Sequence, residues 1–249
     1  MAILGYALAT LIGLSLGLLG GGGSILAVPV LVYVLGFGMK QAVPMSLAVV
    51  GITSAFGVLS HHRNANIRWS AAAAFGPAAI VGAFAGARLA GLVTSRMQLT
   101  IFAVLMLAAA ISMYTGPALW MPSGDQATAR RPWPVVALIG GLVGMLTGLV
   151  GVGGGFLYVP SLVLLAGLPM KQAVGTSLVL IIMSCIAGFI SYLGVETIDW
   201  QATGLFAALA IVGVLVGSRL VNRVSQAGLR KAFAGFLLVM GILVLLKPR

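Results

Sequence analysis

The sequence contains few charged residues, and very few of these are acids. Charged residues make up 7% of the 249 residues, with 14 lysines and arginines against three acids. Hydrophobic residues make up 61%, and the mean hydropathy is +1.16. A soluble core of this size cannot bury so much apolar sequence, which predicts a polytopic helical membrane protein. A transmembrane barrel is excluded, because the apolar stretches are continuous over helical lengths rather than alternating in segments of about ten residues.

Cysteine, histidine and acids are too scarce to form the usual reaction centres. The single cysteine, Cys185, lies inside an apolar block, so we expect a buried small side chain and no disulfide framework. The two histidines, His61 and His62, are adjacent, and the sequence offers no metal-ligand cluster and no nucleophile–base pair. We therefore expect no metal, no cofactor and no enzymatic activity. No acid lies in a predicted membrane span, which disfavours a carboxylate-based proton or sodium site there.

The net charge of +11 does not indicate a nucleic-acid partner. The basic residues stand singly or in pairs between apolar blocks, where loop cations orient a protein in the bilayer. The first twenty residues lack a basic segment before their apolar stretch, so we expect no cleaved signal peptide. These features predict a multi-pass protein of the cell membrane, in a bacterium the inner membrane, with lipid as its main surroundings. The sequence leaves the oligomeric state open between a monomer and a homodimer.

The apolar stretches predict two groups of five helical segments. A polar stretch, 122–131, separates the groups and is the expected linker between a first half, 1–121, and a second half, 132–249. The predicted segments are 3–19, 24–36, 41–60, 69–91 and 97–120 in the first half, and 133–150, 155–167, 171–193, 200–220 and 228–247 in the second.

The second half repeats the first at an offset of 131 residues. Of the 31 positions from Gly17 to Leu47, 18 are identical to those from Gly148 to Leu178. The same offset pairs glycines that are spaced for close helix packing, Gly82 and Gly86 with Gly213 and Gly217. Both halves are therefore predicted to share one fold, as in many transporters.

A glycine cluster interrupts the apolar sequence at the same place in each half, at 20–24 and at 151–155. Each glycine costs a helix about 1 kcal/mol relative to alanine, so the helix is expected to break there. In lipid, the freed backbone groups are tolerated only where protein or a water-filled cavity satisfies them. The two breaks are therefore the first candidates for a polar site.

The first two segments of each half form either one kinked, tilted helix or a hairpin. Together they span about 34 residues, or roughly 50 Å of helix, against a hydrocarbon core of about 30 Å. The kinked helix gives parallel halves and divides the basic residues eight against six; the hairpin gives inverted halves with both termini outside and divides them nine against five. The larger bias favours inverted repeats with a glycine-broken hairpin in each half. The nine cations expected together are Arg63, Arg68, Arg130, Arg131, Lys171, Arg219, Arg223, Arg230 and Lys231.

A helix that restarts after a glycine cluster is suited to bind an anion. Its first N–H groups are unpaired, the helix dipole is positive there, and glycines let an oxyanion approach the backbone. Hydroxyl groups near the start of the following helix are further donors, unless each bonds to a carbonyl of its own helix. The predicted binding residues are Gly20, Gly21, Gly22, Gly23, Ser24, Ser46, Gly151, Gly153, Gly154, Gly155, Thr176 and Ser177.

Four further residues have two interpretations each. Lys40 and Lys171 either recruit the anion or extend to the lipid headgroups. His61 and His62 either relay a proton during transport or form a solvated pair in a surface loop. The sequence does not choose between these roles.

Four motifs stand out: Gly151–Gly155 with Pro160, Ala173–Leu178, Ile198–Trp200, and Gly213 with Gly217 and Arg219. Together they resemble the TauE/SafE sulfite exporter family, also called the TSUP family, over essentially the whole chain. The resemblance implies a secondary transporter, with export as the direction, of small sulfur-containing anions such as sulfite or organosulfonates. The alternative function is an anion channel that uses the same helix starts. The first half departs from the motif, with Pro44-Met45 where the second half has Gly175-Thr176, so the halves are not expected to contribute equally.

Overall fold

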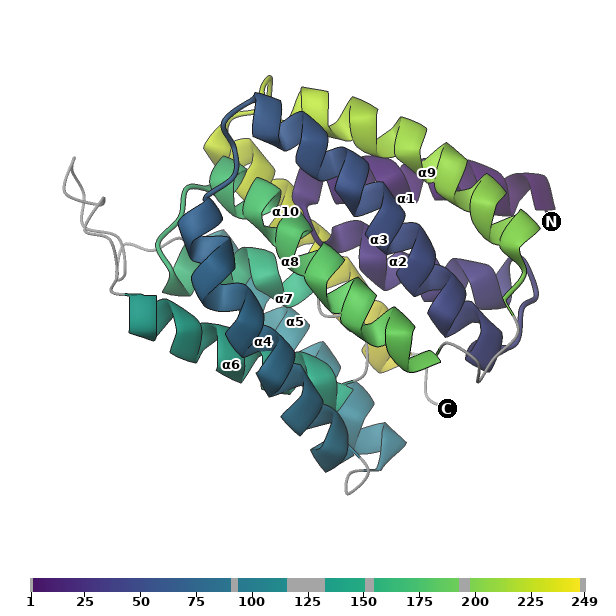
Figure 1. Cartoon of the computed structure of the whole chain (residues 1–249), viewed down its shortest axis with the longest axis horizontal. Helices are drawn as coiled ribbons and strands as arrows, with labels where there is room; N and C mark the ends of the chain where they lie inside the picture. Colours follow the sequence, from purple (N-terminus) through teal and green to yellow (C-terminus); the bar gives the residue numbers. More distant parts are fainter. Residues whose placement is uncertain (1, 91–93, 116–132, 151–154, 193–197, 247–249) are drawn as a thin grey trace.

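All secondary-structure elements in the described part of the chain are helices, as the composition predicts. The computed structural model describes residues 2–90, 94–115, 133–150, 155–192 and 198–246 (Figure 1). Helix bounds agree with the predicted segments to within a few residues, and 155–167 consists of a short α-helix continued by a π-helical turn. The elements are α1 Ala2–Leu19, α2 Gly22–Tyr33, α3 Met39–Arg63, α4 Trp69–Ala90, α5 Ser95–Thr115, α6 Trp133–Val150, α7 Gly155–Pro160, η2 Ser161–Leu165, α8 Met170–Tyr192, α9 Trp200–Leu220 and α10 Gln226–Leu246.

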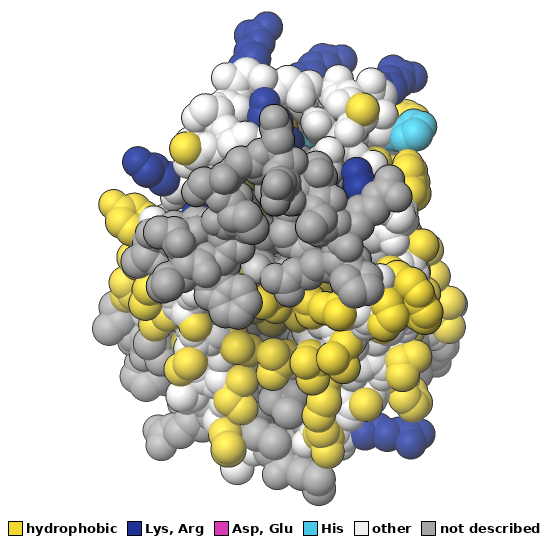
Figure 2. Space-filling view, turned by 90° about the vertical axis from the view of Figure 1, so that its left-hand side faces the viewer, with side chains coloured by type: hydrophobic (Ala, Val, Ile, Leu, Met, Phe, Trp, Pro, Cys, Tyr) yellow, Lys and Arg dark blue, Asp and Glu magenta, His cyan; other side chains and the backbone are white. Residues whose placement is uncertain are grey.

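Five of the helices, α3, α4, α8, α9 and α10, are long and apolar enough to cross a membrane. On the face shown in Figure 2, hydrophobic side chains cover the middle and lower part, and most of the visible Lys and Arg side chains gather at the top of the view. The described acid, Asp199, lies outside the spans and caps α9, because its Oδ1 accepts a bond of 2.9 Å from Ala202 N. The chain is therefore a multi-pass membrane protein, as predicted.

Helix α1 packs along α9, and α4 packs along α6, through the spaced glycines that the sequence singled out. A Cβ atom at Gly213 would overlap Thr10 O of α1, and one at Gly82 would overlap Gly141 O of α6. Gly217 lies in the same way against α1. The prediction that these three glycines allow close helix packing is confirmed, since any side chain there would separate the helices.

Helices α3 and α8 pack against each other in antiparallel directions near the centre of the bundle (Figure 1). Leu47, early in α3, lies against Gly188, late in α8, whereas His61 at the end of α3 lies against Gly175 near the start of α8. The start of α8 and the end of α3 are therefore at the same end of the molecule.

That end of the molecule carries most of the described cations. Asn66 Nδ2, in the α3–α4 loop, donates to Asn222 Oδ1 in the α9–α10 turn at 3.2 Å, and Lys171 Nζ donates to Asn222 O at 3.2 Å. Lys171 N also donates to Gln226 Oε1 at 3.3 Å, and this bond joins the start of α8 to the start of α10. The cations grouped here are Arg63, Arg68, Lys171, Arg219, Arg223, Arg230 and Lys231; Arg130 and Arg131 lie outside the described residues.

Candidate functional site

The first glycine cluster ends one helix and begins another. Gly20 has a φ of +78°, which favours glycine, and its N–H is the last to bond back to α1, at 2.8 Å from Leu16 O. Helix α2 then runs back beside α1, since a Cβ atom at Gly5 would lie 2.6 Å from Leu35 Cδ2. No side chain of the described residues caps the start of α2, where Gly21 is the N-cap.

The starts of α2 and α7 touch each other, although they are more than 130 residues apart in sequence. A Cβ atom at Gly21 would overlap Gly155 O, and one at Gly155 would lie 2.8 Å from Ser24 Oγ. The glycines 20–23 and Gly155 are buried. Because not even a methyl group fits between Gly21 and Gly155, this conformation is closed at the contact. The predicted residues Gly151, Gly153 and Gly154 lie outside the described residues.

The predicted hydroxyl groups are bonded in this conformation. Ser24 Oγ donates to Gly21 O and Ser46 Oγ donates to Val43 O, both at 2.8 Å within their own helices. Ser177 Oγ lies 2.8 Å from Val174 O of its own helix and 3.2 Å from Gly20 O, so it connects α8 to the first break.

Thr176 positions the α3–α4 loop. Its Oγ1 is buried and accepts a bond of 3.0 Å from Arg68 N, just before α4 begins. The preceding Gly175 gives this loop room, since a Cβ atom there would overlap Asn66 O. Gly175 and Thr176 therefore seat the loop of the first half on the start of α8.

The two histidines occupy different environments. His61 is fully buried, because α3 continues one turn beyond its predicted end and directs this side chain into the bundle. Its Nε2 lies 3.1 Å from Gly17 O, and since a carbonyl only accepts, this nitrogen carries the proton. The interpretation of the pair as solvated is thus wrong for His61. His62 is exposed, with its ring edge-on to Trp69 at 5.7 Å between centroids.

The two lysines begin equivalent helices. Lys171 Nζ donates to Asn222 O, so this ammonium group holds the α9–α10 turn. Lys40 lies in the first turn of α3, and its side chain is outside the described part of the chain.

Two polar pairs near the site had no signal in the sequence. Tyr158 OH and Ser184 Oγ are 2.6 Å apart and join α7 to α8, and Asn66 bonds to Asn222 between the two halves. Nothing in the local pattern distinguishes these residues from other polar groups, because each pair depends on helices that meet only in the folded chain.

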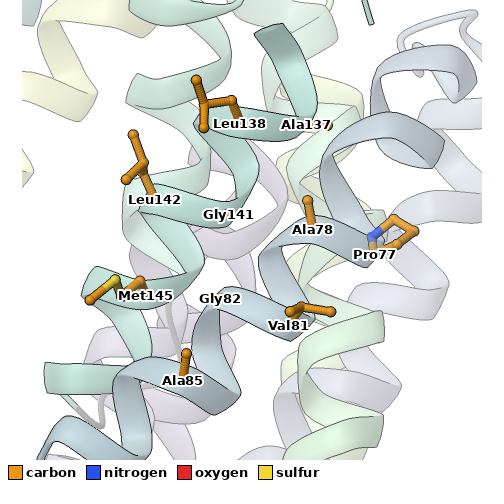
Figure 3. Close-up of a pocket in the computed structure, with 10 residues that line it drawn as sticks. All are labelled: Pro77, Ala78, Val81, Gly82, Ala85, Ala137, Leu138, Gly141, Leu142 and Met145. Carbon is orange, nitrogen blue, oxygen red and sulfur yellow. The ribbon is translucent and has the colours of Figure 1, made fainter. Parts of the chain in front are cut away.

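An apolar groove lies between α4 and α6, with a volume of about 530 Å³ (Figure 3). Its side chains offer no charged or polar group to an anion, and none of the predicted binding residues lines it. The groove therefore fits an apolar occupant such as lipid acyl chains, not the anion. The lining residues are Pro77, Ala78, Val81, Gly82, Ala85, Ala137, Leu138, Gly141, Leu142 and Met145.

Comparison with known proteins identifies similar membrane transporters. The sequence profile of the family described as sulfite exporter TauE/SafE matches residues 5–244. A probable membrane transporter protein of Xylella fastidiosa (strain 9a5c) is 31% identical over 218 residues, covering 87% of this chain and 84% of that protein. Probable membrane transporter proteins of Methanocaldococcus jannaschii and Haemophilus influenzae are each 29% identical, covering 96% and 95% of this chain and 95% of each relative. No solved structure matches the chain.

Proposed function

The chain belongs to the sulfite exporter TauE/SafE family of membrane transporters, and we propose that it exports a small sulfur-containing anion by alternating access. Sulfite, which the family description names, and organosulfonates are the proposed substrates. The observation that carries the proposal is the contact between Gly21 and Gly155, where the two helix starts meet inside the bundle. Two helix N-termini that face each other concentrate unpaired N–H groups and positive dipole ends, which favour an oxyanion.

The proposed architecture is two inverted repeats, 1–121 and 132–249, joined by the linker 122–131, each beginning with a glycine-broken hairpin. Matching features at the offset of 131 support it: Gly36, just after α2, and Gly167, just after η2, have φ values of +81° and +73°. The antiparallel packing of α3 on α8 supports inversion, as does the collection of cations at one end of the bundle. Matching hydrogen bonds run from Phe37 N to Leu31 O at 3.0 Å and from Leu168 N to Leu162 O at 2.9 Å.

The proposed binding groups are the two glycine clusters, at 20–24 and 151–155, with the hydroxyl groups of Ser46, Thr176 and Ser177. Because the contact between the clusters is closed here, an anion enters only when the two halves move apart at the breaks. Such a movement is the rocking of one repeat against the other that alternating access requires. A permanently open anion channel is disfavoured for the same reason.

Counterflow in liposomes tests the transport proposal. We expect purified protein to take up labelled sulfite with saturable kinetics, and unlabelled sulfite on the opposite side to accelerate this uptake. Acceleration follows because a loaded carrier changes conformation in both directions, whereas a pore is indifferent to substrate on the other side. Uptake that is unaffected by sulfite on the opposite side would support a channel, and uptake no faster than in empty liposomes would reject sulfite as substrate.

Two equivalent exposed positions test the inverted topology. Ser70 and Gln201 lie in the first turns of α4 and α9, are exposed, and are separated by the repeat offset. In a Cys185→Ala background, we expect a membrane-impermeant maleimide on intact cells to label the Gln201→Cys variant and not the Ser70→Cys variant. Lysed cells, in which both variants should react, are the control. Labelling of both variants from one side of the membrane would contradict inversion.

A further inference from the structure

Helix α3 contains two fully buried polar atoms without a hydrogen-bond partner among the described residues, Ser54 Oγ and His61 Nδ1. Among the buried side-chain nitrogen and oxygen atoms of the described residues, the only other one without a partner is Nε of Arg230. A buried donor or acceptor that makes no hydrogen bond costs about 1–3 kcal/mol, so each one requires an explanation.

Ser54 differs from the neighbouring hydroxyl groups in having no acceptor. Thr53, the preceding residue, donates to Val49 O at 2.6 Å, and Ser184 on α8 donates to Leu180 O at 3.0 Å. A carbonyl of its own helix is the ordinary acceptor for a serine in a membrane helix. Ser54 does not use it, and its hydroxyl proton is therefore free to donate to another group.

The position of Ser54 on α3 directs it towards α8. Residues 47, 51, 54, 58 and 61 recur at the spacing of one helix face, so they form a single stripe. Three other members of this stripe contact α8, and they lie before and after Ser54 along α3. The contacts, each 3.2 Å from a Cβ atom placed on the glycine, are Leu47 with Gly188, Gly51 with Cys185 and His61 with Gly175.

The part of α8 opposite Ser54 is also the part that touches the second helix break. On α8, Ile181 lies between Cys185, which contacts Gly51, and Leu178, which contacts Gly57. Its Cδ1 would lie 2.9 Å from a Cβ atom at Gly155. Ser54 thus faces the same layer of the bundle as the contact between the two glycine clusters.

We propose that Ser54 binds the transported anion through its hydroxyl group, where α3 faces α8 in the middle of the membrane. The proposal rests on the transport function above and adds a residue that is outside the glycine clusters. An oxyanion only accepts hydrogen bonds, so it supplies the partner that Ser54 lacks. A neutral hydroxyl holds an anion less tightly than a buried cation, which suits a site that must also release it. His61 Nδ1 marks the same face of α3 two turns nearer the cation-rich end.

The Ser54→Ala variant tests this role, with Thr53→Val as the matched control. Thr53 is buried one residue away, but its hydroxyl group is already bonded to Val49 O. We expect Ser54→Ala to melt at or above the wild-type temperature without substrate, because it removes a hydroxyl that has no partner. Its sulfite affinity, measured by the thermal shift and by the KM of uptake, should fall about 10- to 100-fold, as for one hydrogen bond to a charged group. Thr53→Val should melt lower and keep its sulfite affinity.

The measurements separate this inference from the proposed function. If the wild-type protein transports sulfite and the Ser54→Ala variant binds sulfite with unchanged affinity, the inference about Ser54 is overturned and the proposed function is not. A Ser54→Ala variant that melts lower without substrate would also overturn it, since the hydroxyl group would then stabilise the fold. Wild-type protein that shows no thermal shift with sulfite, thiosulfate, sulfate, taurine or sulfoacetate would overturn both.

Discussion

Replacing Gly21 with alanine should strongly reduce transport and destabilise the protein. The added methyl group would overlap the backbone of Gly155, and a backbone atom cannot move aside as a flexible side chain can. Overpacking of this kind costs about 1–3 kcal/mol, and in the transport cycle it would hold the two helix starts apart. We expect sulfite uptake in liposomes to fall more than about tenfold, the equivalent of about 1.4 kcal/mol, with a lower melting temperature.

Gly204→Ala is the matched control for this variant. Gly204 also lies in a helix, α9, but beyond the backbone of its own helix no atom of the described residues lies within 4 Å of a Cβ atom placed there. Alanine should therefore leave transport unchanged and raise stability by up to about 1 kcal/mol, the ordinary helix preference. Equal transport by the Gly21→Ala and Gly204→Ala variants would remove the physical basis of the anion site. Gly22 is a weaker test, because a Cβ atom placed there would lie 3.1 Å from Phe236 Cε1, and this is a side-chain atom rather than backbone.

Replacing Gly175 with alanine should have the second largest effect. The methyl group would overlap Asn66 O and displace the α3–α4 loop from the start of α8. Displacement also lengthens the bond from Arg68 N to Thr176 Oγ1, which leaves a buried hydroxyl without its donor. We expect a loss of about 1–3 kcal/mol of stability and a reduced rate of uptake, because the loop packs on the turn of α8 from which Ser177 bonds to Gly20 O at the first break.

The comparison variant for Gly175 is Gly235→Ala, since Gly235 lies in α10 with no atom within 4 Å of an added Cβ. A second comparison, Thr176→Val, removes the acceptor for Arg68 N without adding volume at Gly175. We expect it to lower the melting temperature less than Gly175→Ala does. If Gly175→Ala melts and transports like Gly235→Ala, the α3–α4 loop is not held against the start of α8 at this position.

The departure of the first half from the family motif has a structural reason. Gly175 and Thr176 hold the α3–α4 loop, whereas the equivalent Pro44 and Met45 are buried in α3 with no such loop bond among the described residues. The sequence predicted that the halves contribute unequally, and the described contacts differ at these positions.

The sequence by itself determined the helices, the first break and the repeat. These follow from local causes: apolar length sets the spans, glycines end helices, and an offset of 131 residues pairs the halves. Helix bounds were predicted to within a few residues, and the main error, the early end of α3, moved His61 from a solvated loop into the bundle. One extra helical turn decided the burial of that side chain.

Only the tertiary structure decided which polar groups meet. Thr176 bonds to Arg68 N across 108 residues of sequence, Ser177 reaches Gly20 O across 157, and Ser54 has no partner at all within the described chain. Composition and spacing do not rank one buried serine above another, nor Gly21 above Gly22. That ranking depends on which backbone lies opposite each residue, and this is fixed by the packing of helices from both halves.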